Sequence, residues 1–140
     1  MLSRIFGKTP DYPPLPVGSP LGARIHDLND YLSALADRVR QPLEVLPLPN
    51  AAYVFTGDPP RKFDLAWVRD GEIGSLRALV EQKGVPQEAV EAAVVQLEAA
   101  YRARHDAERY TADLGEDRVV VTDSPELVAE VDAVVRKLVG

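Results

Sequence analysis

Residues 51–71, AAYVFTGDPPRKFDLAWVRDG, carry the clearest structural signal in this chain, because they read as two strands joined by a turn. Apolar residues alternate along each arm, and side chains two apart lie on the same face of a strand, so each arm presents an apolar face. The aromatic side chains of the two arms are Tyr53, Phe55, Phe63 and Trp67. Burying a large apolar side chain contributes about 1.5–3 kcal/mol, and an isolated hairpin is marginal in water. We therefore expect the flanking helices to cover this aromatic face.

The tip of the hairpin, residues 57–62, contains two adjacent cations, Arg61 and Lys62. Such a pair can meet an acidic partner or a phosphate, although turn tips are commonly polar because they are solvated. If the hairpin binds a partner, the candidate binding residues are Tyr53, Phe55, Phe63, Trp67, Arg61 and Lys62.

The composition fits one globular domain with a hydrophobic core. The chain has 140 residues, of which 46% are hydrophobic and 27% are charged. Its net charge is −6, and acidic residues outnumber basic ones in residues 51–100 and again in residues 101–140. Because a nucleic-acid backbone attracts positive charge, we do not expect nucleic acid as the main ligand. The absence of cysteine excludes disulfides, thiolate metal sites and cysteine nucleophiles.

No apolar run approaches the roughly 20 residues that a membrane span needs, and no signal-peptide core follows Met1. We therefore expect a cytoplasmic protein without a membrane span. Twelve arginines against four lysines are typical of a GC-rich bacterial genome.

We expect residues 1–18 to form a proline-rich N-terminal arm and residues 19–140 to form a single α+β domain. The run YPPLP at residues 12–16 favours an extended polyproline conformation, which predicts an arm lying on the surface of the domain. Two alternatives stay open for the arm, a membrane-touching anchor at residues 2–8 and a ligand for an aromatic groove.

The first helix begins at Ser19-Pro20, where serine suits the N-cap and proline suits the first turn, and it stops before Pro42. Its apolar residues follow at alternating spacings of four and three, which predicts one helix with a seam on one face. The seam consists of Leu21, Ile25, Leu28, Leu32, Leu35 and Val39. We expect the seam to cover the hairpin face. The same spacing is typical of coiled coils, so a homodimer through Leu21, Ile25, Leu28, Leu32 and Leu35 is the alternative.

Two more strands are predicted from local composition. Residues 43–48 form a short strand, but Pro42, Pro47 and Pro49 cannot donate to a ladder, so we expect this strand at a sheet edge or a bulge. Residues 119–121 are three valines, a run that is apolar on both faces and is therefore expected inside the sheet.

Three more helices are predicted, over residues 73–83, from Pro86 onward, and from Ser124-Pro125 onward. The polar tract at residues 102–109 predicts a solvated helix end that runs toward Gly115. The order helix, three strands, two helices, strand, helix favours an α+β fold, with a mostly antiparallel sheet of about four strands packed against amphipathic helices.

The sequence offers little support for catalysis. Its two histidines occur in His26-Asp27 and His105-Asp106, on different predicted helices, and no metal-binding histidine motif is present. Neighbouring positions on a helix point about 100° apart, so neither aspartate can readily orient its own histidine. Neither a Gly-x-Ser-x-Gly elbow nor a glycine-rich phosphate loop occurs. We expect no metal and no cofactor, and we keep as an alternative a small enzyme that uses His26 or His105 with nearby carboxylates.

Residues 76–93, in which Gly84-Val85-Pro86 separates two helices, resemble a helix-turn-helix unit. The resemblance implies a regulator linked to nucleic acid. However, the second helix begins with Gln87-Glu88 and adds Glu91, so acidic side chains would face DNA phosphates.

Small α+β domains with this order of elements include chaperone-like and regulatory dimers, although fold analogy is weak support for a function. Together with the absence of catalytic motifs, the acidic body, the arm and the helix seam, this favours a non-enzymatic protein-binding or regulatory module. We expect it to be chaperone-like or adaptor-like, with a protein as its partner.

Overall fold

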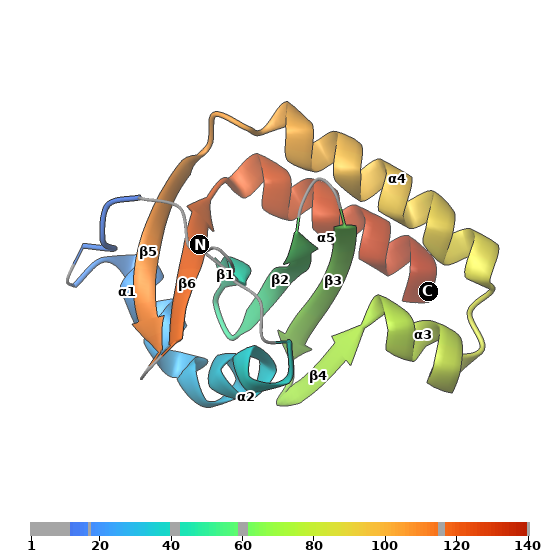
Figure 1. The fold of residues 1–140 in the computed structure, drawn as a ribbon, viewed down its shortest axis with the longest axis horizontal. Coiled ribbons are helices and arrows are strands. Elements are labelled where there is room, and N and C mark those ends of the chain that lie inside the picture. Colours follow the sequence, from blue (N-terminus) through green and yellow to red (C-terminus); the bar gives the residue numbers. More distant parts are fainter. Residues whose placement is uncertain (1–11, 17, 40–42, 59–61, 115–116, 140) are drawn as a thin grey trace.

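A computed structural model describes residues 12–16, 18–39, 43–58, 62–114 and 117–139. These residues form helices and strands in the order α1 (Pro20–Asp27), α2 (Asn29–Val39), β1 (Glu44–Leu48), β2 (Ala51–Asp58), β3 (Lys62–Arg69), β4 (Glu72–Ser75), α3 (Leu76–Lys83), α4 (Gln87–Ala103), β5 (Glu108–Leu114), β6 (Asp117–Asp123) and α5 (Pro125–Val139). The fold is α+β, with six strands in one sheet in the order β4-β3-β2-β1-β6-β5 (Figure 1).

The sheet is mixed, because β1 and β6 run parallel while the other neighbouring strands run antiparallel. The predicted sheet of about four mostly antiparallel strands is therefore two strands too small. The prediction missed β5, which it read as a polar helix end, and β4, whose Ile73 it read as the start of a helix. Both strands are edge strands that depend on a neighbour for their conformation, so local sequence is a poor guide to them.

The prediction that residues 43–48 lie at a sheet edge is wrong, since β1 lies between β2 and β6. The parallel register with β6 covers only Glu44 and Val45. Pro47 comes after that paired stretch and lies opposite Ala52 of β2. A proline can therefore occupy an interior strand here, because its missing N–H falls beyond the stretch that pairs with β6.

The hairpin and the inner strand were predicted correctly. Strands β2 and β3 pair with Tyr53 opposite Trp67, and the next turn has φ of 53° at Asp70 and 76° at Gly71. Positive φ at both central residues is the arrangement that Asp-Gly favours in two-residue hairpin turns. The three valines at residues 119–121 are buried in β6, which lies between β1 and β5.

Helices cover both faces of the sheet, and each face has its own hydrophobic core. Helices α1 and α2 pack on one face, against Val54 and Ala66, whereas α3, α4 and α5 pack on the other, against Tyr53 and Phe55. Figure 1 shows α4 and α5 side by side. The expectation that the N-terminal helix seam covers the aromatic face is wrong. Alternation along β2 places its aromatic residues on the opposite face from Val54.

The N-terminal helix is divided in two at Leu28, where φ is −103° and ψ is 9°. Its apolar seam is buried within the same chain, because Ile25, Leu28, Leu32 and Leu35 are at most 5% exposed. The homodimer alternative through this seam is therefore not supported, since only Leu21 of the five proposed contact residues keeps partial exposure.

The described part of the arm, residues 12–16, lies along the outer edge of β5. Pro14 forms a parallel bridge with Thr111, whose N–H donates to Pro13 O at 2.9 Å and whose carbonyl accepts from Leu15 N at 2.8 Å. The predicted surface arm is thus attached to the sheet at this point. Residues 1–11, including the predicted anchor at residues 2–8, lie outside the described residues.

Candidate functional site

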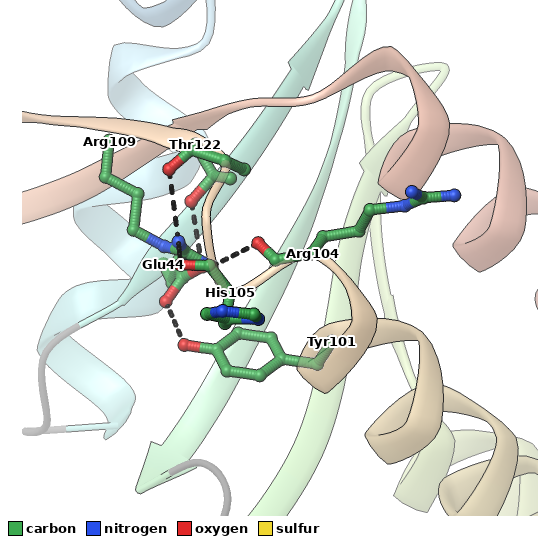
Figure 2. A network of polar contacts seen from close by, with 7 residues as sticks. Glu44, Tyr101, Arg104, His105, Arg109 and Thr122 are labelled. Carbon is green, nitrogen blue, oxygen red and sulfur yellow. Dashed lines mark hydrogen bonds and ion pairs between the residues drawn. The ribbon is translucent and has the colours of Figure 1, made fainter.

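A buried ion pair fixes the connection between α4 and β5 to the middle of the sheet (Figure 2). Glu44 stands at the first position of β1, and its Oε2 accepts hydrogen bonds from Arg109 Nε at 3.2 Å and Thr122 Oγ1 at 2.8 Å. Its Oε1 accepts from the Tyr101 hydroxyl at 2.7 Å. The side chains of Glu44 and Arg109 are only 13% and 6% exposed, so this pair lies in the interior.

Arg109 also donates to the backbone of the connection between α4 and β5. Its NH1 group donates to the carbonyls of His105 and Ala107 at 3.1 and 3.2 Å, and its guanidinium lies 5.5 Å from the centre of the Tyr101 ring. Burial, and then the negative charge of Glu44, raise the pKa of Tyr101. Both carboxylate oxygens are occupied, which fits a cluster that stabilises the fold rather than one that reacts.

A second polar cluster joins α5 to the hairpin. Asp132 Oδ1 accepts hydrogen bonds from the Tyr53 hydroxyl and from Arg69 NH2, the latter at 3.1 Å, while Oδ2 accepts from Arg136 Nε at 2.6 Å. Arg69 NH2 also donates to the Tyr53 hydroxyl at 2.7 Å. Burial raises the pKa of Tyr53 to about 12, helped by its hydrogen bond to Asp132. Burial alone would raise the pKa of Asp132, but hydrogen bonds from Tyr53, Arg136 and Arg69 outweigh it and lower that pKa.

This Asp132 cluster forms part of the wall of a crevice of about 460 Å³, which we call the arginine crevice. The crevice lies where the carboxyl ends of β1 and β6 meet α1 and the start of α5. Its arginines are Arg24 from α1, Arg69 from β3 and Arg136 from α5. Three arginines from three separate elements thus line one cavity.

A second cavity, of about 390 Å³, lies between α3 and α4; we call it the α3–α4 groove. Its apolar lining residues are Leu76, Val80, Val90 and Val94. Its acidic lining residues are Asp64, Glu81 and Glu91. The groove therefore combines an apolar surface with several carboxylates.

The hairpin residues that the sequence indicated as a binding surface lie mainly in the core. Tyr53 and Phe55 are each 1% exposed, and Trp67 is half-buried, with its ring against Gly74 of β4. The Tyr53 hydroxyl is hydrogen-bonded within the Asp132 cluster, to Asp132 and Arg69. The side chains of Phe63 and Lys62, and Arg61 as a whole, lie outside the part of the chain that the structure describes.

The two histidines are not brought together with carboxylates. His26 is exposed on α1, and His105 is exposed after α4, where its Nδ1 lies 3.1 Å from the carbonyl of Arg102. Among the described residues, neither histidine has a hydrogen bond or ion pair with an aspartate or glutamate. Within the same residues, no group of three or more histidine and carboxylate side chains could hold a metal ion.

The two helices expected on either side of Gly84 are present as α3 and α4, and Gly84 has φ 71°. The exposed side of α4 carries Glu88 and Glu91, so the helix presents negative charge where a DNA reader needs positive charge. In the described part of the chain, no helix is long and apolar enough to cross a membrane.

The residues of the arginine crevice were missed by sequence reasoning. Asp132 and Arg136 are four apart on α5, a spacing that predicts an ion pair, and this signal was available. Arg24 and Arg69 carried no local signal, because only the order of the strands brings them near α5. Searches of protein-family models, curated proteins and solved structures find no match for this chain.

Proposed function

We propose that this protein is a non-enzymatic binding module, chaperone-like or adaptor-like, that recognises a segment of a partner protein in the α3–α4 groove. The single observation that carries the proposal is an apolar groove surrounded by carboxylates. Leu76 and Val90 form its nearly buried floor, with exposed fractions of 2% and 8%. Val80 and Val94 keep partial exposure in its walls.

Charge indicates the kind of segment that fits. Asp64, Glu81 and Glu91 line the groove, whereas Arg77 is the cation among its lining residues. A partner helix with apolar residues three and four apart and lysine or arginine beside them would match both properties. Val95, which is 65% exposed, is a further apolar residue at the surface of α4.

A short connection joins the two helices that form the groove. Gly84 adopts φ 71° at the end of α3, and Val85 N donates to the carbonyl of Leu79 at 3.0 Å. A glycine in the left-handed conformation commonly ends a helix, and α4 begins three residues later at Gln87. A preformed groove reduces the ordering cost of binding.

Selection of a random peptide library on the full-length protein tests the proposal. We expect the selected peptides to carry apolar residues at helical spacing flanked by lysine or arginine. The variant Val94→Glu should weaken their binding about tenfold or more, because it places a charge in the apolar wall. The matched control is Val139→Glu, at a valine that is 56% exposed near the end of α5, which should bind normally. Peptides without cations, or equal binding to Val94→Glu, would contradict the proposal.

A further inference from the structure

The arginine crevice occupies a special position in the topology. Strands β1 and β6 are the parallel pair in the described sheet, and their paired stretch ends at Val45 and Val121. Beyond it the two strands separate, since β1 turns back into β2 whereas β6 leads into α5 (Figure 1). In open sheets a crevice forms outside the carboxyl ends of parallel strands where the chain departs in different directions, and ligands bind there.

The charged groups of the crevice leave donors available for a ligand. Arg136 uses Nε for Asp132, and Arg69 uses NH2 for Asp132 and Tyr53. The NH1 and NH2 groups of Arg136 have no partner among the described residues. The side chain of Arg24 has no hydrogen bond or ion pair within them either. A guanidinium carries five N–H donors in a planar fork that suits carboxylate and phosphate oxygens.

The balance of charge also favours an anion. The crevice contains three arginines against two aspartates, Asp123 and Asp132, in a protein whose net charge is −6. Both oxygens of Asp132 already accept hydrogen bonds, so its charge is offset by Arg69 and Arg136. The crevice lining thus keeps one positive charge in excess, with Arg24 in no ion pair among the described residues and Asp123 as the second carboxylate.

The rest of the lining is largely apolar, with Leu21, Pro47, Leu48 and Val128 in the wall. At the start of α5, Pro125 carries no N–H group and Leu127 N already donates to Ser124 Oγ at 3.1 Å. The positive charge comes from side chains, and an apolar body can lie against the wall beside it.

We propose that the arginine crevice binds a small organic anion, a molecule that carries one carboxylate or phosphate group on an apolar body. The acidic group contacts Arg24 and Arg136, and the apolar body lies against Leu48 and Val128. This site is separate from the α3–α4 groove and does not depend on the function proposed for that groove.

Nuclear magnetic resonance titration of the full-length, nitrogen-15-labelled protein tests the proposal with four probes: phenylacetate, phenyl phosphate, phenylacetamide and inorganic phosphate. At least one of the two organic anions should cause saturable shifts of the Nε–H signals of Arg24 and Arg136 and of the Val128 amide. The tighter of the two identifies the acidic group. Neutral phenylacetamide and inorganic phosphate should each bind at least about tenfold more weakly, because each lacks one of the two features. Absence of saturable shifts with both organic anions, or equal binding of either reference probe, would overturn the proposal.

Substitutions distinguish binding in the arginine crevice from a nonspecific attraction of anions by positive charge. Arg24→Gln should weaken binding of the better anion about tenfold, and its fold should be intact because Arg24 has no ion pair among the described residues. The matched control is Arg118→Gln, at an exposed arginine that pairs with Asp113 on β5, which should bind as the unmodified protein does. Val94→Glu in the α3–α4 groove should also leave anion binding unchanged. Equal losses in Arg24→Gln and Arg118→Gln would show nonspecific attraction and contradict the site.

Discussion

At the scale of single residues, Glu44 shows how one carboxylate can organise a protein interior. Its two oxygens collect hydrogen bonds from α4, β5 and β6, through Tyr101, Arg109 and Thr122. Placing a carboxylate in a sheet interior is costly unless its oxygens are satisfied. Here they are, and the Tyr101 ring additionally meets Phe55 edge-on at 5.2 Å between centroids.

Removing this carboxylate should therefore destabilise the folded protein. We expect Glu44→Ala to lower the free energy of unfolding by about 3–5 kcal/mol, because it leaves the Arg109 charge buried without its partner. Urea denaturation followed by circular dichroism measures the change. The control is Asp113→Ala, which breaks the exposed pair with Arg118, where the side chains are 68% and 60% exposed, and should cost at most about 1 kcal/mol. A loss of similar size in both variants would contradict the importance of burial.

At the scale of elements, β4 depends on a glycine. Gly74 lies directly opposite Trp67 of β3, and a methyl group at Gly74 would approach the indole Cε2 to 2.6 Å. Trp67 covers the position where another residue would have its side chain. The short strand β4 can therefore pair with β3 only because this position is empty.

Gly74→Ala tests this packing. We expect a loss of about 1–3 kcal/mol in unfolding free energy, because the ring must move out of its position. Trp67 is the single tryptophan of the chain, so its fluorescence should report the displacement directly. Glu72→Ala, at an exposed residue of the same strand, should change stability by no more than about 0.5 kcal/mol. An unchanged fluorescence spectrum in Gly74→Ala would show that the contact is not tight.

Some helices and strands could be predicted from the sequence and others could not. The β2–β3 hairpin and the α5 start at Ser124-Pro125 were predicted correctly, because alternation and capping act within a few residues. Strand β5 was not, because its polar sequence resembles a helix end and it takes its conformation from the neighbouring β6. The interior position of β1 was not, because it depends on pairing with β6 from a distant part of the chain. The same limit applies to the arginine crevice, since Arg24 and Arg69 meet α5 only through the order of the strands.

At the scale of the whole molecule, one outer edge of the sheet is short and the other is partly covered by the N-terminal arm. One edge is the four-residue strand β4, which leads straight into α3. The other is β5, where Pro14 of the arm bridges Thr111. Exposed strand edges can pair with another molecule, and shortening or covering them prevents that association.

Two truncations separate the bridge from the remainder of the arm. We expect deletion of residues 1–16 to speed hydrogen exchange of the Thr111 amide and to cause concentration-dependent association, because the edge of β5 is uncovered. Deletion of residues 1–11 keeps the bridge and should leave both properties unchanged. Hydrogen exchange and light scattering measure the two effects. Equal behaviour of the two truncated proteins would show that the bridge does not protect the edge.

The contact between Pro14 and Thr111 also links the order of synthesis to the order of assembly. During translation the arm leaves the ribosome early, whereas the strand it covers follows almost a hundred residues later. The arm can pair with β5 only after β5 has emerged from the ribosome and has paired with β6. Pairing of the arm with β5 is therefore a late step of folding. A nascent chain interrupted before Thr111 lacks the strand to which the arm binds.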